Sequence, residues 1–119
     1  MKVIIAGGRD FDNYDNLGSF FNKCLDFSNL RLNELEIVSG TARGADKLGE
    51  RYADKIKVKV KQFPANWDAH GKAAGYIRNE EMAKYADCLI AFWDGKSKGT
   101  KHMIDLALKH KLETHIKIY

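Results

Sequence analysis

Glycine, arginine and short hydroxyl residues are concentrated in a few short segments of this sequence. The densest segment is residues 39–46, which read SGTARGAD and follow a short apolar run. Glycines let a backbone approach a ligand closely, and a helix that begins near Arg43 would direct unpaired N–H groups and its positive dipole end at an anion. The guanidinium of Arg43 adds a planar pair of donors for phosphate or carboxylate, whereas Asp46 is also explained as a favourable charge in a first helical turn. The predicted ligand contacts here are Ser39, Gly40, Thr41, Arg43, Gly44 and Asp46.

Two other turns have a similar composition. Residues 7–11 read GGRDF after one apolar run, and residues 94–100 read DGKSKGT after another. Neither matches the G-x-G-x-x-G or the G-x-x-x-x-G-K-[ST] spacing, so nucleoside triphosphatase chemistry is not expected. The first turn is equally explained as a tight turn with a surface Arg9–Asp10 pair. The predicted ligand contacts in these two turns are Gly7, Gly8, Arg9, Asp94, Gly95, Ser97, Gly99 and Thr100.

A further segment, residues 67–79, combines aromatic, basic and amide side chains with two glycines. An aromatic ring can stack on a base, and for Trp67 this is as good an explanation as a place in the core. Arg78 and Asn79 begin a predicted helix whose other positions face the core, so we predict that both contact the ligand. Trp67 or Tyr76 is predicted to stack on its base.

These segments must be positioned by an alternation of strands and helices. Short apolar runs alternate with stretches of helical periodicity, a pattern that predicts an α/β fold of parallel strands joined by crossover helices. We expect the polar side chains of the last helix, His102, Lys109 and His110, on its exposed face. The predicted strands are Val3–Ala6, Leu35–Val38, Val58–Phe63, Cys88–Phe92 and Thr114–Ile118. The predicted helices carry apolar stripes at Leu17–Leu25, Ala45–Ala53 and Met103–Leu108, and a fourth helix spans Tyr76–Ala86.

The composition of the strands predicts their order in the sheet. The first and fourth strands are apolar on both faces and are therefore central. The third alternates lysines with Val58 and Val60, and the fifth alternates His115 and Lys117 with isoleucines, as edge strands do. We predict a Rossmann-like three-layer domain with a five-stranded parallel sheet in the order 3-2-1-4-5. In that order a ligand binds above the carboxyl ends of strands one, two and four, which the three glycine-rich turns follow.

Length and composition limit the class of protein. The 119 residues, 45% of them hydrophobic, match one domain with one core, residues 1–119. A net charge of +4 with both signs interspersed does not favour nucleic-acid binding. No signal-peptide core is present, and no run approaches the ~18 apolar residues of a membrane span. Because Cys24 and Cys88 lie in separate apolar stretches without metal-ligand spacing, we expect reduced core thiols, a cytoplasmic protein and no metal.

Taken together, the segments GGR at 7–9, SGTARGAD at 39–46, AGYIRN at 74–79 and DGKSKGT at 94–100 resemble the YspA-like branch of the SLOG superfamily. The resemblance covers nearly the whole chain and implies a Rossmann-like fold with a site for a nucleotide or nucleotide-derived ligand. The superfamily includes LOG phosphoribohydrolases, which release a base from a nucleoside monophosphate, DprA-like DNA-processing proteins, and sensor domains of antiviral systems that bind cyclic or NAD-derived nucleotides. Relatives commonly dimerise, so the resemblance also implies a homo-oligomer.

One departure from the LOG pattern concerns catalysis. Residues 78–82, RNEEM, resemble the LOG R-K-x-x-M segment, and the DGKSKGT turn resembles its P-G-G-x-G-T turn. The LOG pattern G-T-x-x-E carries an essential glutamate where this chain has Met103, and a thioether can neither accept a proton nor stabilise a cationic centre. Glu80 or Glu81 is the candidate substitute, on its position beside Arg78 alone. No Ser-His-Asp arrangement or isolated carboxylate pair is present, and whether the chain is an enzyme stays open.

The sequence therefore predicts a protein that binds a nucleoside monophosphate, an ADP-ribose or NAD-derived molecule, or a cyclic nucleotide, as a sensor or a sequestering protein. Arg43 and Arg78 are expected on its phosphates, and no separate cofactor is expected. Two alternatives stay open. One is a nucleotide N-glycosidase or phosphoribohydrolase related to the LOG enzymes. The other is a DprA-like DNA-processing role, for which the lysines at positions 55, 57, 59 and 61 offer a basic row that strand-edge solubility explains equally well.

Overall fold

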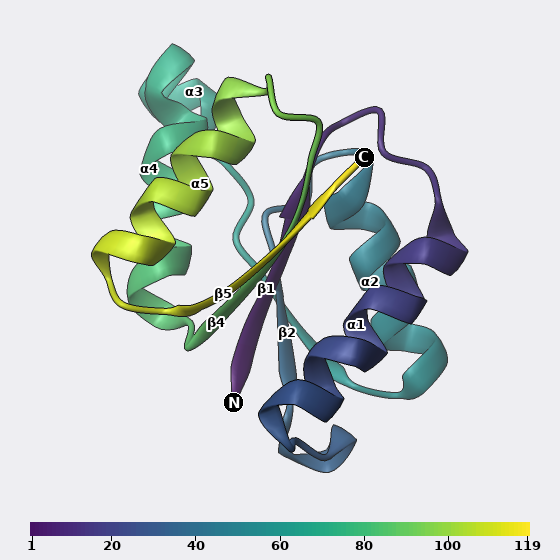
Figure 1. Cartoon of the computed structure of the whole chain (residues 1–119). Helices are drawn as coiled ribbons and strands as arrows, with labels where there is room; N and C mark the ends of the chain where they lie inside the picture. The colour runs from purple at the N-terminus through teal and green to yellow at the C-terminus, as the bar shows by residue number, and fades with distance from the viewer.

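Five parallel strands form one sheet in the order β3-β2-β1-β4-β5 in a computed structural model that describes residues 1–119 (Figure 1). Helices pack on both faces of this sheet, and the arrangement confirms the predicted Rossmann-like α/β fold and strand order. The strands are β1 (Lys2–Gly7), β2 (Glu36–Ser39), β3 (Lys59–Gln62), β4 (Cys88–Trp93) and β5 (Glu113–Ile118). The helices are α1 (Tyr14–Ser28), α2 (Ala45–Ile56), α3 (Trp67–His70), α4 (Ala74–Tyr85) and α5 (Lys98–Lys109), with 3-10 turns at Leu32–Glu34 and Gly71–Ala73.

The helices divide into two pairs, α1 and α2 on one face of the sheet and α4 and α5 on the other (Figure 1). Successive residues of a strand point to opposite faces. As a result, β1 supplies Val3 and Ile5 to the core under α1 and α2, and Ile4 and Ala6 to the core under α4 and α5. Each fully buried Val or Ile side chain stabilises the fold by about 1.5–3 kcal/mol. This two-sided burial explains why an entirely apolar strand occupies the centre of the sheet.

The helix ends on the α1–α2 face follow from a few residues with special backbone preferences. The side chain of Asn13 accepts the N–H of Asn16 at 3.0 Å and so caps the start of α1. That helix ends at Asn29, which has a left-handed φ of 54°, and α2 ends in the same way at Lys57. The start of α2 is different, because Gly44 precedes it with a φ of 81° and no side chain caps it.

Parallel pairing brings three turns to one edge of the sheet. β1 pairs with β2 on one side and with β4 on the other. The last residues of these strands, Gly7, Ser39 and Trp93, therefore lie at the same edge. The glycine-rich turns that follow these strands therefore meet at this edge, as predicted. They lie where the strand order changes direction, because β2 and β3 are added on one side of β1 and β4 and β5 on the other.

The edge strand β3 differs in detail from the prediction. All four of its residues are exposed, and Val60 keeps 37% of its surface open to solvent. Only Lys59 and Lys61 of the lysine row belong to the strand, because Lys55 lies in α2 and Lys57 is the residue that caps α2. The expected basic row is therefore divided between a helix, its cap and a strand.

The burial of side chains in the edge strand β5 and in the last helix, α5, also differs from the prediction. Ile116 of β5 is exposed, and on α5 the predicted stripe residue Leu108 is exposed whereas Leu106 is buried. His110 was predicted to be exposed but is half-buried, because it follows the buried Ala107 by three residues and so returns to the same face of the helix. None of the helices has the length and apolar surface that a bilayer crossing requires.

Candidate functional site

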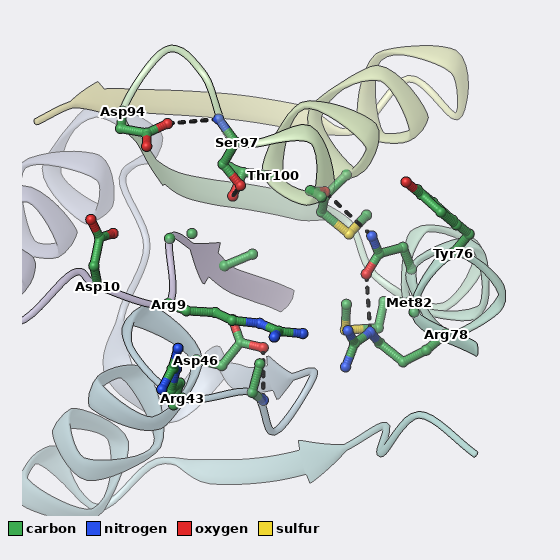
Figure 2. Close-up of a pocket in the computed structure, with 18 of the residues that line it drawn as sticks. Arg9, Asp10, Arg43, Asp46, Tyr76, Arg78, Met82, Asp94, Ser97 and Thr100 are labelled. Carbon is green, nitrogen blue, oxygen red and sulfur yellow. Dashed lines mark hydrogen bonds between the residues drawn. The ribbon is translucent and has the colours of Figure 1, made fainter. Parts of the chain in front are cut away.

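A pocket of about 480 Å³ opens at the carboxyl edge of the sheet, between the turns that follow β1, β2 and β4 and the first half of α4 (Figure 2). The pocket collects most of the residues that the sequence predicts as ligand contacts. The predicted contacts that line it are Gly7, Gly8, Arg9, Arg43, Asp46, Trp67, Arg78, Asn79, Asp94, Ser97, Gly99 and Thr100. Further lining residues include Asp10, Lys72, Gly75, Tyr76, Met82 and Met103.

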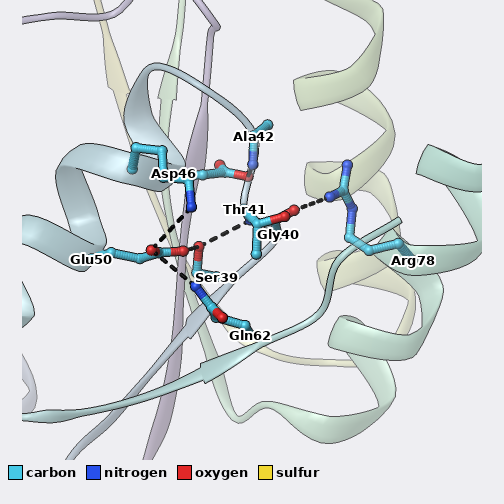
Figure 3. A network of polar contacts seen from close by, with 9 residues as sticks. Ser39, Gly40, Thr41, Ala42, Asp46, Glu50, Gln62 and Arg78 are labelled. Carbon is cyan, nitrogen blue, oxygen red and sulfur yellow. Dashed lines mark hydrogen bonds and ion pairs between the residues drawn. The ribbon is translucent and has the colours of Figure 1, made fainter. Parts of the chain in front are cut away.

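Five predicted contacts do not line the pocket, and Figure 3 shows three of them, Ser39, Gly40 and Thr41, beside Asp46 and Arg78. Ser39 is buried and donates its hydroxyl to Glu50 at 2.6 Å. A Cβ on Gly40 would lie 2.8 Å from both an Nη atom of Arg78 and a carboxylate oxygen of Asp46. Glycine is therefore needed here so that two side chains of the protein can approach the backbone. The other predicted contacts that do not line the pocket are Thr41, Gly44 and Gly95, and all three have a positive φ.

Three backbone N–H groups of the 39–46 turn have acceptors within the protein. Thr41 donates to the hydroxyl of Ser39 at 3.1 Å, and Ala42 donates to the carboxylate of Asp46 at 3.2 Å (Figure 3). Ala45, the first residue of α2, donates to the carbonyl of Gly8 at 3.2 Å. Asp46 therefore accepts an N–H group of this turn as an external anion would, and three N–H groups of the turn are already used within the protein.

The start of α5 also carries backbone N–H groups without an acceptor. The carboxylate of Asp94 accepts the N–H groups of Lys96 and Ser97, each at 2.8 Å, and these two bonds lower the pKa of Asp94. The first hydrogen bond within the helix runs from Lys101 to the carbonyl of Ser97, so the N–H groups of residues 98–100 have no acceptor in the protein. Residues 99 and 100 line the pocket. Free N–H groups at a helix start form a favourable place for an anion.

Three arginines face the same pocket without a carboxylate partner. None of Arg9, Arg43 and Arg78 forms an ion pair; the four ion pairs of the chain involve lysines and a histidine. Arg78 donates through Nη1 to the carbonyl of Gly40 and through Nε to Asn79 at 3.0 Å, which leaves Nη2 without an acceptor. Burial lowers the pKa of Arg78, although Asp46 opposes the shift. The arginines therefore share the pocket with Asp10, Asp46 and Asp94 without forming an ion pair of 4.0 Å or less with any of them.

Asp46 is the buried acid of the pocket. It keeps only 6% of its surface exposed, and burial raises its pKa to about 6, against the opposing effects of the Ala42 N–H and of Arg78. Its position between arginines is visible in Figure 2. A carboxyl with this pKa exchanges its proton near neutral pH, so it can act both as an acceptor and as a donor of hydrogen bonds to a ligand.

Replacing Asp46 by asparagine is expected to change how stability depends on pH. The carboxyl has a pKa of about 6 in the folded chain and about 3.9 when unfolded. Its contribution to stability is therefore complete below pH ~4 and is lost as the pH rises through ~6. We expect Asp46→Asn to be more stable than the parent by about 1–3 kcal/mol at pH 8 and equal to it near pH 4, in urea unfolding.

The control for this prediction is Asp54→Asn, which removes an exposed carboxylate from the same helix. That variant should follow the parent at both pH values. An Asp46→Asn variant whose free energy of unfolding differs from the parent by the same amount at pH 4 and pH 8 would contradict the assignment.

A polar link joins α4 to the start of α5 at the pocket wall. The buried side chain of Asn79 contacts the carbonyl of Gly99 at 3.5 Å and Nδ1 of His102 at 3.2 Å. The ring edge of His102 packs on Tyr76, with centroids 4.5 Å apart. His102 was predicted to be exposed, but it is half-buried because this link draws it toward α4. Asn79 therefore positions both Arg78 and the free N–H groups of α5.

Two aromatic rings stand at the open side of the pocket. Trp67 is 52% exposed and Tyr76 is 48% exposed, and both line the pocket. The alternative in which Trp67 anchors the core does not match this exposure. Large exposed rings beside a cavity can stack on a flat ligand.

The two glutamates proposed as substitutes for the LOG acid do not line the pocket. Glu80 lies 3.5 Å from Lys84, one helical turn along α4, and Glu81 is exposed. Met103 does line the pocket and is buried. The buried acid of this pocket is Asp46, which the sequence predicted as a ligand contact or as a favourable charge in the first turn of a helix.

A second cluster, at the other end of the sheet, escaped the sequence analysis. The Sγ of Cys88, a carboxylate oxygen of Glu113 and a ring nitrogen of His115 all lie within 4.8 Å of one another. Cys88 and Glu113 are direct neighbours in the β4–β5 register. Residues 25 positions apart give no local spacing signal, so this grouping follows only from the register of the two strands. The other thiol, Cys24, is buried and free, as predicted.

Comparison with known proteins gives a family match and one curated relative. The profile of the YspA, cpYpsA-related SLOG family matches residues 1–70, which extend from β1 to α3. The Gene 61 protein of Mycobacterium phage D29 is 41% identical over 81 residues. That alignment covers 63% of this chain and 65% of the phage protein. No solved structure matches the chain.

Proposed function

We propose that the pocket of this protein binds a phosphate-bearing nucleotide. The chain belongs to the YspA, cpYpsA-related SLOG family, and membership of this family indicates a nucleotide-related ligand. The observation that carries this proposal is the combination of three arginines without ion pairs and the free N–H groups of α5 around one pocket. An anion would satisfy both groups of donors. A volume of about 480 Å³ is sufficient for a small nucleotide.

The two ends of the pocket suit the two ends of a nucleotide. A phosphate at the start of α5 would accept the N–H groups of Gly99 and Thr100, with the Nη2 of Arg78 as a further donor. Trp67 and Tyr76 would enclose the base at the open side. The ligands that fit this division are nucleoside monophosphates, ADP-ribose or NAD-derived molecules, and cyclic nucleotides. The protein would then act as a sensor of such a molecule or as a protein that sequesters it.

Calorimetric titration of the chain with AMP, ADP-ribose, NAD and a cyclic dinucleotide tests the proposal. We expect at least one of them to bind. We also expect adenosine to bind at least about tenfold more weakly than AMP, if AMP is a ligand, because adenosine lacks the charge-assisted hydrogen bonds of the phosphate. Absence of binding by all four phosphate-bearing molecules would overturn the proposal, as would equal affinities for AMP and adenosine.

A second candidate function, hydrolysis of the N-glycosidic bond, is favoured by the buried Asp46 beside Arg78. In that reaction the oxygen of water attacks the anomeric carbon and the bond from that carbon to the base breaks. Adenine takes up a proton from solvent as it leaves AMP, whereas nicotinamide leaves NAD as a neutral base and one proton of the water passes to solvent. Asp46 as carboxylate would take the proton of the attacking water. Incubation with AMP or NAD should then release free base in the parent and not in Asp46→Asn. Binding without release of base in the parent would leave the binding proposal standing and exclude this reaction for those substrates.

A further inference from the structure

The cluster of Cys88, Glu113 and His115 lies away from the nucleotide pocket. The residues occupy the amino-terminal part of β4 and β5, whereas the pocket lies above the carboxyl ends of the strands (Figure 1). Cys88 pairs with Glu113 across the two strands. His115 follows Glu113 by two residues on the same strand, so the two side chains point to one face of the sheet. Three different donor atoms, sulfur, oxygen and nitrogen, are thus directed at one point.

We propose that Cys88, Glu113 and His115 form a binding site for a divalent transition metal of the zinc class. Thiolate, carboxylate and imidazole are the protein ligands that zinc uses. With metal–sulfur bonds of about 2.3 Å and metal–nitrogen or metal–oxygen bonds of about 2.0–2.2 Å, tetrahedral ligand atoms lie roughly 3.2–3.7 Å apart. The three donor atoms, all within 4.8 Å of one another, can reach one ion with small side-chain adjustments.

The surroundings of the three side chains support a metal site. The hydroxyl of Ser28, on α1, donates to the carboxylate of Glu113 and so orients it. The ring of Phe27 packs edge-on against His115, with centroids 5.5 Å apart, and shields one side of the imidazole. The side chains of Glu113 and His115 are 35% and 16% exposed, which leaves a route for an ion from solvent.

Without a metal, the same atoms form a hydrogen-bonded cluster around Glu113. Its carboxylate contacts the ring of His115 at 2.7 Å and the thiol of Cys88 at 3.8 Å. Burial, with the charge of Glu113, raises the pKa of Cys88 to about 12, so the thiol keeps its proton. Metal binding must replace that proton: the S–H bond breaks, a metal–sulfur bond forms, and the proton passes to the buffer. The metal would join the edge strand β5 to β4 and act on stability rather than on the pocket.

Titration of the metal-free full chain with Co²⁺ under a non-thiol reductant tests the site. We expect a thiolate-to-cobalt charge-transfer band in the near ultraviolet that saturates at about one ion per chain and disappears when Zn²⁺ is added. In weakly buffered solution near neutral pH, the titration should also release about one proton from the thiol per ion bound. Binding of Co²⁺ by the other histidines gives no thiolate band, so the band reports this cluster.

Two pairs of variants separate the metal site from a purely structural cluster. The band should vanish in Cys88→Ser and persist in Cys24→Ser, which changes the other buried thiol. Because Cys88 lies in the core, its substitution could disturb folding, and His115→Gln and Glu113→Gln provide a second test at partly exposed positions. Each of these two variants should bind Co²⁺ at least about tenfold more weakly than the parent and should keep the circular dichroism spectrum of the parent. The proposal is wrong if the parent gives no thiolate band, if the band follows Cys24 instead of Cys88, or if both glutamine variants bind Co²⁺ as tightly as the parent.

Discussion

Replacing Arg78 with alanine is expected to weaken binding of the phosphate-bearing ligand by about 10–100-fold, which corresponds to about 1.4–2.8 kcal/mol. Arg78 is the half-buried arginine of the pocket, and its Nη2 has no acceptor in the protein. A phosphate that accepts this donor in a partly desolvated place gains more than it would from the exposed Arg9 or Arg43. Calorimetry with whichever nucleotide the parent binds gives the ratio of the two affinities.

The variant also has an effect on the fold that must be separated from the effect on binding. Arg78→Ala removes the donor to the Gly40 carbonyl, which costs about 1–3 kcal/mol of stability if that carbonyl stays buried and unpaired. A thermal melt establishes that the variant is folded at the temperature of the titration. Arg31→Ala, at an exposed arginine that does not line the pocket, should bind like the parent. Equal affinities of Arg78→Ala and the parent would contradict the role of Arg78.

The sheet and the location of the pocket could be predicted because they depend on patterns within single segments. The strands at Val3–Ala6 and Cys88–Phe92 are apolar at every position, and this alone makes them central. Lysines at alternate positions place the third strand at an edge. Once the order is known, the three glycine-rich turns must meet at one edge of the sheet, and the pocket lies there.

Which backbone N–H groups of the pocket are free for a ligand could not be predicted, because this depends on the acceptor that each N–H group meets in the folded chain. The 39–46 turn has the composition of a phosphate-binding turn, yet three of its N–H groups are taken by Ser39, Asp46 and Gly8. Nothing in the local sequence distinguishes an acid that caps its own turn from an acid that contacts a ligand. The start of α5 has free N–H groups as well, because Asp94 accepts only from residues that precede the helix.

The same limit explains why Glu80, the candidate acid beside Arg78 in the sequence, does not line the pocket. Its neighbour Arg78 lines the pocket, but two residues along a helix rotate the side chain to a different face. Glu80 instead lies beside Lys84, one turn further along the same face. Adjacency in sequence is a weak guide to adjacency in a site when the segment is helical.

The packing of the turns predicts a large effect of a single methyl group at Gly44. Its φ of 81° and ψ of −129° lie in a region that residues with a Cβ rarely adopt, which costs about 1–3 kcal/mol on substitution. A Cβ there would also meet the carbonyl oxygen of Gly8 and lie 2.7 Å from the backbone of Arg9. Displacing that backbone adds about 1–3 kcal/mol. We therefore expect Gly44→Ala to lower the free energy of unfolding by about 2–6 kcal/mol.

Two other glycines separate the two contributions in the same urea-unfolding experiment. Gly71 has nearly the same backbone conformation, with a φ of 53° and a ψ of −132°, but a Cβ there meets nothing within 4 Å. Gly71→Ala should therefore show the conformational cost alone, about 1–3 kcal/mol. Gly99 has neither the positive φ nor a close neighbour, so Gly99→Ala should be no less stable than the parent. If Gly44→Ala loses no more stability than Gly71→Ala, then the contact between the β1 and β2 turns is not what requires glycine at position 44.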